Sequence, residues 1–181
     1  MPSPTTDTTT PLAPECFTQI KLLVLDFDGV LTDDRVLVGE DGSEFVLCSR
    51  SDGMGISLLK RRGLPIAILS TETNRVVTAR ARKLGLPVHQ GLDNKGAALQ
   101  QLIEERQIPP GCVAFVGNDI NDVDCLRLAG LAIVPADAQL VAREHADIVL
   151  TNPGGRGAVR ELADLILASG WQAETPGEAD A

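Results

Sequence analysis

The chain has 181 residues, of which 44% are hydrophobic and 23% are charged, and its formal net charge is −9. This length is enough for one domain with a buried core. The negative charge disfavours nucleic acids and anionic membranes as partners, and the low aromatic content (3%, with no Tyr) leaves few side chains on which bases could stack. We therefore expect neither a nucleic-acid nor a membrane partner.

The two ends of the chain differ in composition from its middle. Residues 1–19 are rich in Pro and Thr, and residues 172–181 are polar and acidic, so we expect a disordered tail on each side of one domain spanning residues 20–171. We expect no signal peptide and no membrane-spanning stretch. The four cysteines have no C-x-x-C spacing, which predicts reduced thiols in a cytoplasmic protein.

Short apolar runs alternate with amphipathic stretches along the predicted domain. We expect strands over residues 21–26, 65–70, 87–89, 112–116, 131–134 and 147–150. We expect helices over residues 52–62, 73–84, 94–106, 121–128, 139–144 and 157–168, the first of them capped by Asp52. Turn-forming residues between segments 35–38 and 44–48 predict a β-hairpin. The alternation predicts a three-layer α/β/α fold with a mostly parallel, Rossmann-like central sheet and a small hairpin insert.

Polar residues follow the predicted strands at the points where those strands end. Asp26 and Asp28 follow the first strand, Ser70 follows the second, and the segment 117–122 (Gly-Asn-Asp-Ile-Asn-Asp) follows the fourth. Ligands of such sheets bind beyond the carboxyl ends of the strands. We therefore expect these side chains, together with Lys95, to form one site.

The chemistry of this set points to phosphoryl transfer. Carboxylates gathered at one sheet edge repel one another unless a cation lies among them, and oxygen ligands with open positions suit Mg²⁺. A carboxylate such as Asp26 can attack phosphorus if a metal, a lysine and a hydroxyl donor offset the charge. Asp28, two residues further along the extended chain, is placed to act as general acid and then base. Gly29 would let the backbone turn sharply and leave room for the phosphate.

These residues make the chain resemble the haloacid dehalogenase superfamily of phosphatases, across essentially the whole predicted domain. The resemblance rests on four pieces in order: Asp26-Phe27-Asp28-Gly29-Val30-Leu31-Thr32, Ser70, Lys95 and Gly117-Asn118-Asp119-Ile120-Asn121-Asp122. It implies that Asp26 is the nucleophile and Asp28 the acid/base. It also implies that Ser70 and Lys95 hold the phosphate.

The same resemblance implies a Mg²⁺ ion held by Asp26, by the carbonyl of Asp28 and by the segment that follows the fourth strand. The family usually has Asp directly after the glycine of that segment, where this chain has Asn118. Either Asn118 ligates the metal as a neutral amide, or Asp119 or Asp122 supplies the acidic ligand. The sequence leaves these alternatives open.

The chain is also similar to the small capless branch of this superfamily, the 3-deoxy-octulosonate 8-phosphate and nonulosonate 9-phosphate phosphatases. The same domain occurs fused behind acylneuraminate cytidylyltransferases. Segments 50–56, 90–95 and 154–161 carry this similarity. It implies an aspartyl-phosphate mechanism on a phosphorylated 2-keto-3-deoxy sugar acid, no cap domain, and a homotetramer assembled through the hairpin. We expect the substrate to be bound by Gly29, Arg50, Asp52, Thr71, Glu72, Arg80 and Arg156.

Glu72 bears on which sugar acid is the substrate. The octulosonate enzymes carry Gly-Arg after the hydroxyl residue, whereas this chain has Thr71 and Glu72 after Ser70. An Arg there would pair with a substrate carboxylate, and a Glu would repel it and accept from hydroxyl or amine groups. We therefore favour a nonulosonate 9-phosphate over octulosonate 8-phosphate.

A second hypothesis is a non-catalytic or weakly active module associated with a cytidylyltransferase pathway. The uncharged Asn118 favours it, and the intact set of Asp26, Asp28, Ser70 and Lys95 argues against it. A phosphomutase would need a cap domain, and no insertion of that size follows Gly29 or Ser70.

Overall fold

The computed structural model describes residues 14–173. Its central sheet has six parallel strands in the order β5-β4-β1-β6-β7-β8. The strands are β1 (Leu22–Leu25), β4 (Ile66–Leu69), β5 (Val88–His89), β6 (Val113–Val116), β7 (Leu131–Val134) and β8 (Ile148–Val149). Every residue of β1, β4, β6 and β7 is buried, which explains why these strands are apolar without alternation.

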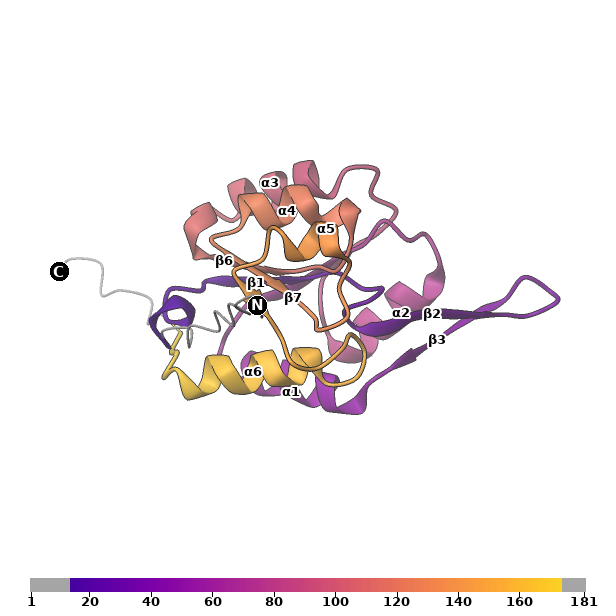
Figure 1. Cartoon of the computed structure of the whole chain (residues 1–181), viewed down its shortest axis with the longest axis horizontal. Helices are drawn as coiled ribbons and strands as arrows, with labels where there is room; N and C mark the ends of the chain where they lie inside the picture. Colours follow the sequence, from indigo (N-terminus) through magenta and orange to yellow (C-terminus); the bar gives the residue numbers. More distant parts are fainter. Residues whose placement is uncertain (1–13, 174–181) are drawn as a thin grey trace, which may run out of the picture.

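Helices cover both faces of the sheet. They are α1 (Arg50–Arg61), α2 (Arg75–Leu84), α3 (Lys95–Glu105), α4 (Val123–Leu128), α5 (Leu140–Arg143) and α6 (Ala158–Ala168). Figure 1 shows α3, α4 and α5 on one side of the sheet and α1 and α6 on the other. Leu23 and Leu25 of β1 belong to a hydrophobic cluster that includes side chains of α1, α2 and α6, whereas Leu22 and Val24 belong to a second cluster with α3, α4 and α5. The predicted three-layer α/β/α architecture is confirmed.

The strand order fixes where a ligand can bind. From β1 the chain continues to β4 on one side of it, and only later returns to β6 on the other side. Connections that leave a strand in opposite directions open a crevice beyond its carboxyl end. The residues that follow β1 therefore lie at this switch point.

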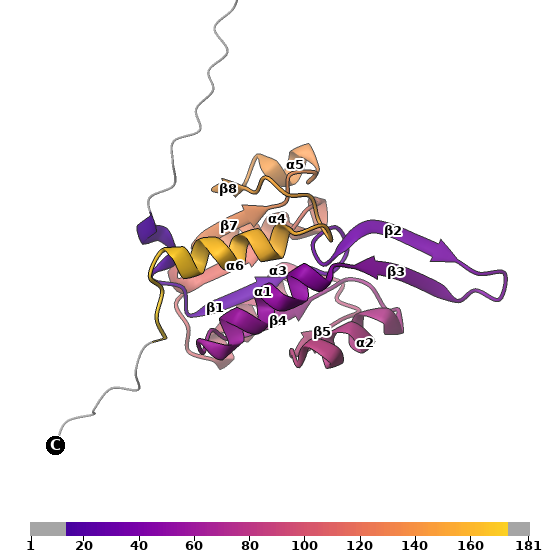
Figure 2. The same cartoon turned by 90° about the horizontal axis from the view of Figure 1, so that it is seen from below.

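A two-stranded hairpin, β2 (Thr32–Val38) and β3 (Glu44–Cys48), is inserted between β1 and α1 and projects well beyond the sheet (Figure 2). The prediction of a hairpin is confirmed, although β2 begins at Thr32 rather than at residue 35. Within residues 14–173 the hairpin is the one β insertion outside the main sheet, and there is no cap domain. No helix in this part of the chain is long and apolar enough to cross a membrane.

The ordered domain begins earlier than the sequence suggested. A 3-10 helix forms at Pro14–Phe17, and the side chain of Phe17 is buried in the core. At the other end, Trp171 is buried and its indole Nε1 donates a hydrogen bond of 2.8 Å to the carbonyl of Ile20. Residues 14–19 are therefore part of the domain, and the predictions of disorder for residues 1–13 and 174–181 lie outside the described residues.

The N-terminus of α1 also differs from the prediction. Ser49 is the N-cap, and its hydroxyl accepts from the N–H groups of Ser51 and Asp52. Asp52 does not cap its own helix. It is fully buried, and its carboxylate accepts hydrogen bonds from the backbone N–H groups of Gly157 (3.3 Å) and Arg160 (2.9 Å) at the start of α6. The N-cap of α6 is Gly157, which has no side chain to accept a hydrogen bond. Asp52 of α1 therefore caps α6 in its place.

Candidate active site

Four buried polar side chains lie beyond the carboxyl ends of neighbouring strands. Asp26 follows β1, Ser70 follows β4, Asn118 comes two residues after β6, and Lys95 is the first residue of α3. Each is at most 7% exposed. The parallel register of β1 with β4 and with β6 brings these strand ends together. The structure thus gathers the residues that the sequence placed in one site.

Lys95 is held between two carboxylates. Its Nζ lies 2.7 Å from Asp26 Oδ1 and 2.8 Å from Asp122 Oδ1. Burial lowers the pKa of the Lys95 ammonium, but Asp26 and Asp122 outweigh this effect and raise the pKa above its usual value. A lysine at a helix N-terminus is disfavoured by the helix dipole, so these carboxylates account for its position. The site therefore contains a fixed positive charge next to Asp26.

Asp122 positions this lysine and the loop after β6. Its Oδ1 accepts from Lys95, and its Oδ2 accepts from the N–H groups of Asn118 (2.9 Å) and Asp119 (3.3 Å). Both oxygens of Asp122 are thus used to position groups of the protein. A Cβ on Gly117 would lie 2.5 Å from the Cβ of Asp122, which explains the glycine at that position.

Asp119 has a local role as well. Its Oδ1 accepts a hydrogen bond of 2.6 Å from the N–H of Ile120 and so caps the 3-10 helix Ile120–Asp122. Of the three alternatives for the metal ligand after β6, Asn118 is the one whose side chain faces Asp26. One terminal atom of its amide lies 3.3 Å from Asp26 Oδ2 and 3.0 Å from the carbonyl oxygen of Asp28.

These three groups fit an oxygen-ligated cation. The amide oxygen of Asn118 faces these two oxygens, so that three oxygens lie together, and the amide nitrogen would donate to both only if the amide were rotated. Adjacent ligands in an octahedral Mg²⁺ site are separated by roughly 3 Å, which matches these distances. Among the described residues no three His, Cys, Asp or Glu side chains gather around a possible metal position, so an amide and a carbonyl have to complete the set.

Gly29 makes room for this arrangement. Its φ is +72°, and a Cβ at this position would lie 1.9 Å from Nδ2 of Asn118. The sequence suggested that the missing side chain leaves space for a phosphate. The structure shows that the Asn118 amide occupies that space.

Asp28 is placed at the edge of the buried cluster. Its Oδ1 accepts a hydrogen bond of 3.1 Å from the hydroxyl of Thr32. Burial raises the pKa of the Asp28 carboxyl above its usual value, and the charges of Glu72 and Asp34 raise it further, against the opposing effects of Thr32 and Lys95. A carboxyl group with a raised pKa is suited to donate a proton near neutral pH.

Comparison with known proteins agrees with this geometry. The sequence profile described as haloacid dehalogenase-like hydrolase matches residues 52–130. The 3-deoxy-D-manno-octulosonate 8-phosphate phosphatase of Salmonella typhimurium is 37% identical over 173 residues, covering 93% of this chain and 92% of that protein. The chain belongs to the haloacid dehalogenase-like hydrolases. Its full-length relatives place it among the phosphatases of that family.

Solved structures and a larger relative extend this family assignment. A HAD family hydrolase from Streptomyces avermitilis is 53% identical with a TM-score of 0.81, covering 82% of this chain and 86% of that one. The octulosonate 8-phosphate phosphatase of Moraxella catarrhalis, solved with magnesium, phosphate and KDO, is 33% identical with a TM-score of 0.83, covering 86% and 90%. N-acylneuraminate cytidylyltransferase A of Danio rerio is 34% identical over 89% of this chain but only 38% of that protein.

Beside Asp28, this haloacid dehalogenase-like phosphatase has a cleft of about 320 Å³ between the hairpin and the start of α2. Asp28, Thr71 and Glu72, which the sequence analysis singled out as candidate site residues, line it. The sequence analysis did not single out the other lining residues: Asp34, Arg35, Val36, Glu44, Val46 and Val76. Most of them lie on the hairpin, and the one sequence signal that could have found them was the insertion of that hairpin directly after Asp28.

The remaining predicted substrate residues do not line this cleft. Arg50 is exposed at the start of α1, and Arg80 donates a hydrogen bond of 2.7 Å to the carbonyl of Ser49. Arg156 pairs with Asp33 at 3.1 Å. The carboxylate of Asp52 caps α6. The contacts of Arg80, Arg156 and Asp52 link the base of the hairpin, α1, α2 and the start of α6.

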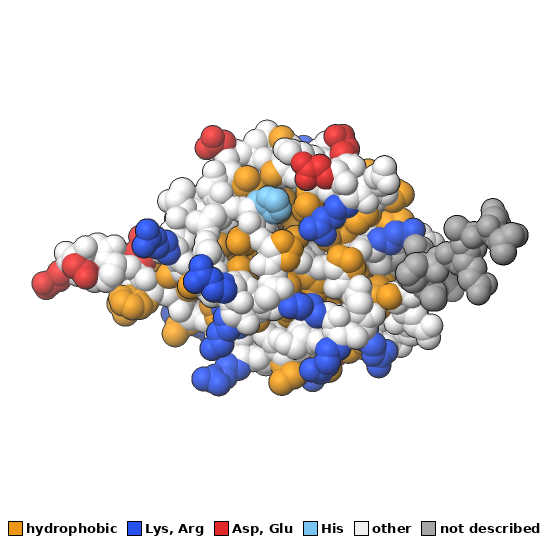
Figure 3. Space-filling model, turned by 180° about the vertical axis from the view of Figure 1, so that it is seen from behind, with side chains coloured by type: hydrophobic (Ala, Val, Ile, Leu, Met, Phe, Trp, Pro, Cys, Tyr) orange, Lys and Arg blue, Asp and Glu red, His pale blue; other side chains and the backbone are white. Residues whose placement is uncertain are grey.

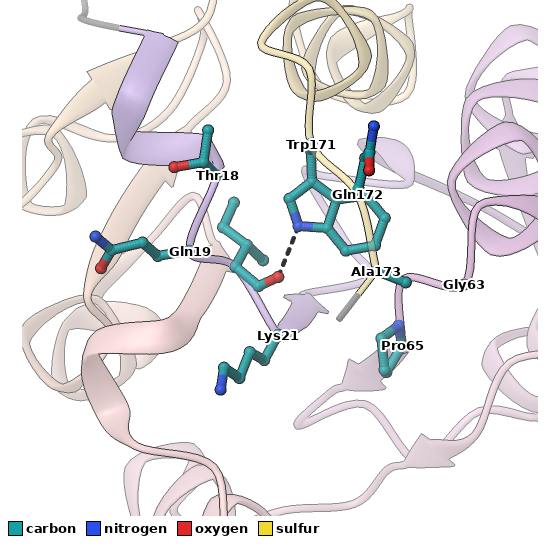
Figure 4. A pocket seen from close by; sticks show the side chains of 9 residues that line it. Thr18, Gln19, Lys21, Gly63, Pro65, Trp171, Gln172 and Ala173 are labelled. Atoms are coloured by element: carbon teal, nitrogen blue, oxygen red, sulfur yellow. Dashed lines mark hydrogen bonds between the residues drawn. The ribbon is translucent and has the colours of Figure 1, made fainter. Parts of the chain in front are cut away.

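Another cavity, of about 200 Å³, lies at the opposite edge of the sheet (Figure 4). It is lined by residues that precede β1, residues that precede β4 and the segment after α6: Thr18, Gln19, Ile20, Lys21, Gly63, Pro65, Trp171, Gln172 and Ala173. Because parallel strands begin at this edge and β1 ends next to Asp26, the cavity is remote from the buried cluster around Asp26.

Proposed function

We propose that the chain is a Mg²⁺-dependent phosphomonoesterase that acts through an aspartyl-phosphate formed on Asp26. The observation that supports this most directly is the position of the Asp26 carboxylate. One oxygen contacts the Lys95 ammonium, and the other faces the Asn118 amide beside the carbonyl of Asp28. A buried carboxylate between a fixed cation and a set of metal-type oxygen ligands is arranged to meet an anionic phosphate.

The residues divide the reaction between them. An oxygen of Asp26 attacks phosphorus and the bond from phosphorus to the leaving oxygen breaks, while the Asp28 carboxyl gives its proton to that oxygen. Asp28, now a carboxylate, takes a proton from water as that water attacks the aspartyl-phosphate, which releases phosphate and restores Asp26. The Ser70 hydroxyl and the Lys95 ammonium hold phosphate oxygens. Mg²⁺, when held by Asp26, the Asp28 carbonyl and Asn118, supplies further positive charge beside the phosphate.

We further propose that the substrate is a phosphorylated sugar acid. The support is the similarity over nearly the full length to octulosonate 8-phosphate phosphatases, one of which is solved with magnesium, phosphate and KDO. The preference for a nonulosonate 9-phosphate remains a prediction, supported by the presence of Glu72 in the cleft beside Asp28.

The four cysteines form no disulfide, in keeping with a reducing compartment such as the cytoplasm, which we propose as the location.

Phosphate release tests this function. The wild-type chain and the Asp26→Asn variant are compared on nonulosonate 9-phosphates, octulosonate 8-phosphate and common sugar phosphates, with Mg²⁺ and with EDTA. We expect turnover that needs Mg²⁺ and is lost in the variant. Turnover that survives in EDTA or in Asp26→Asn would exclude the mechanism, and the preferred substrate tests the inference drawn from Glu72.

A non-catalytic module is the alternative, because Asn118 brings no charge to the metal site and because a similar segment forms part of a cytidylyltransferase. Calorimetric titration with Mg²⁺ separates the two functions. Binding at millimolar Mg²⁺ or below supports the phosphatase. No binding, together with no turnover, supports the module.

We also propose that the hairpin joins copies of the chain in a homotetramer. Leu37, Phe45 and Leu47 are 70%, 59% and 74% exposed, and the pairing of Leu37 with Phe45 puts these side chains on one face of the hairpin. Figure 3 shows hydrophobic side chains on this projecting part of the molecule. An exposed apolar patch of this kind is typical of an interface. Light scattering is expected to give a tetramer for the wild type and smaller species for Leu47→Glu; a monomeric wild type excludes the assembly.

A further inference from the structure

Two cavities lie end to end between the hairpin and α2. The inner one, of about 320 Å³, begins at Asp28. The outer one, of about 510 Å³, lies between the hairpin turn and the first turns of α2. Both are lined by Glu44 and Val76. Because they share these two lining residues the cavities adjoin, and we call them the inner and outer compartments of a groove along β3 and α2. These two elements are in contact and lie side by side in Figure 2.

The two compartments of this groove differ in charge. The inner compartment is lined by four carboxylates and one guanidinium: Asp28, Asp34, Glu44, Glu72 and Arg35. The outer compartment adds Arg75, which is exposed and has no carboxylate partner among residues 14–173. No acidic residue in the first turn of α2 offsets its charge. A negative inner part therefore leads to an outer part that contains an unpaired cation.

Two of the inner carboxylates, Glu44 and Glu72, accept hydrogen bonds from Asn74, which lines the outer compartment. Glu44 Oε2 accepts from Nδ2 of Asn74 at 2.7 Å. Glu72 Oε1 accepts from the N–H groups of Thr73 (2.6 Å) and Asn74 (2.9 Å). Each carboxylate thus has one oxygen fixed and a second oxygen that can accept from a ligand. Fixed acceptors of this kind bind hydroxyl groups and repel a carboxylate.

We propose that this groove binds one extended sugar-acid phosphate in a single direction, with the hydroxyl-bearing carbons next to the phosphate in the inner compartment and the carboxylate at Arg75 in the outer one. The proposal rests on the phosphatase function proposed above and adds Arg75 as a residue that determines specificity. It requires a substrate with its phosphate and its carboxylate at opposite ends of the carbon chain.

A matched pair of ligands tests the assignment. 6-Phosphogluconate and glucitol 6-phosphate share a six-carbon chain and differ only at C1, which is a carboxylate in the first and an alcohol in the second. Their dissociation constants are measured by calorimetry with Mg²⁺ in an Asp26→Asn background that prevents turnover. We expect the acid to bind about tenfold more tightly, a factor that corresponds to about 1.4 kcal/mol.

Two arginine variants test whether the preference for 6-phosphogluconate over glucitol 6-phosphate depends on Arg75. Arg75→Gln is expected to abolish the difference between the two ligands. Arg82→Gln removes the same charge from an exposed position in the last turn of the same helix, outside both cavities, and is expected to retain it. Equal binding of the two ligands, or a preference that survives in Arg75→Gln, overturns the proposal. The ratio of kcat/KM for the pair in the wild-type chain gives a second reading that does not depend on the Asp26→Asn variant.

The outcome separates this proposal from the proposed function. Hydrolysis of both phosphates without a preference for the acid overturns the role of Arg75 and leaves the phosphatase intact. A preference for the acid that depends on Arg75, in a chain that hydrolyses no phosphate, supports the groove assignment and overturns the catalytic function.

Discussion

The buried cluster around Asp26 and the groove beside the hairpin are built in different ways. In the cluster, Lys95 lies between two carboxylates, and Asp122 uses both its oxygens within the protein. In the groove, Arg35 and Arg75 are exposed and lie on the hairpin and on the first turn of α2. In the proposed function, the sheet therefore fixes the groups of the chemical step, and the inserted hairpin with α2 provides the surface proposed to select the leaving group. Substitutions in the cluster should therefore change stability and turnover, whereas substitutions in the groove should change the preference for one substrate over another.

The largest effect is expected from Lys95→Met. This change leaves Asp26 and Asp122 buried near each other without a cation, which should lower the free energy of unfolding by about 3–5 kcal/mol. It also removes the ammonium proposed to bind phosphate, so kcat should fall by at least about a hundredfold. Urea denaturation and phosphate release measure the two effects.

Lys83→Met, at an exposed position in the last turn of α2, is the matched control and should change neither quantity appreciably. If Lys95→Met were as stable as this control, the charge arrangement described for the cluster would be wrong.

A second test compares alanine substitutions at two glycines, one beside Asn118 in the cluster and one in the turn of the hairpin. Gly29 and Gly42 have φ values of +72° and +80°, so Ala at either position carries a similar backbone cost, about 1 kcal/mol. A Cβ at Gly29 would lie 1.9 Å from the Asn118 amide, whereas a Cβ at Gly42 would meet nothing within 4 Å. Gly29→Ala should therefore displace Asn118 and weaken Mg²⁺ binding at least about tenfold by calorimetry. Gly42→Ala should bind Mg²⁺ as the wild type does, and equal affinities in the two variants would contradict the role given to Asn118.

The difference between the buried cluster and the groove also explains which features the sequence could predict. Asp26, Ser70 and Asn118 each follow a buried strand, and parallel strands bring such positions together whatever their distance along the chain. The fold and the cluster were therefore predictable from the pattern of apolar runs and strand ends.

The groove was not predictable in this way. Its walls depend on where the hairpin lies relative to α2, a tertiary contact that no local pattern encodes. The role of Asp52 was misjudged for a similar reason. A carboxylate near the start of a helix normally caps that helix, but Asp52 caps a helix that follows more than a hundred residues later.

Asp52→Ala tests that cross-helix cap. It leaves the N–H groups of Gly157 and Arg160 without an acceptor in the interface of α1 and α6, and should cost about 1–3 kcal/mol in urea denaturation. Asp164→Ala removes an exposed carboxylate that pairs with Arg160 within α6, and should cost about 0.5 kcal/mol or less. A stable Asp52→Ala variant with a raised KM would instead return Asp52 to the substrate site.

The smallest effect is expected from Arg156→Ala. Its partner Asp33 lies 3.1 Å away, but the Arg156 side chain is 58% exposed, so solvent screens the pair and its loss should cost less than about 1 kcal/mol. Because Arg156 does not line the groove, the KM for octulosonate 8-phosphate should be that of the wild type. Urea denaturation at low salt and in 1 M NaCl checks the first point, since the difference between the variant and the wild type should shrink when salt screens the pair. A KM that rises while stability is unchanged would show that Arg156 contacts the substrate, as its position in the sequence first suggested.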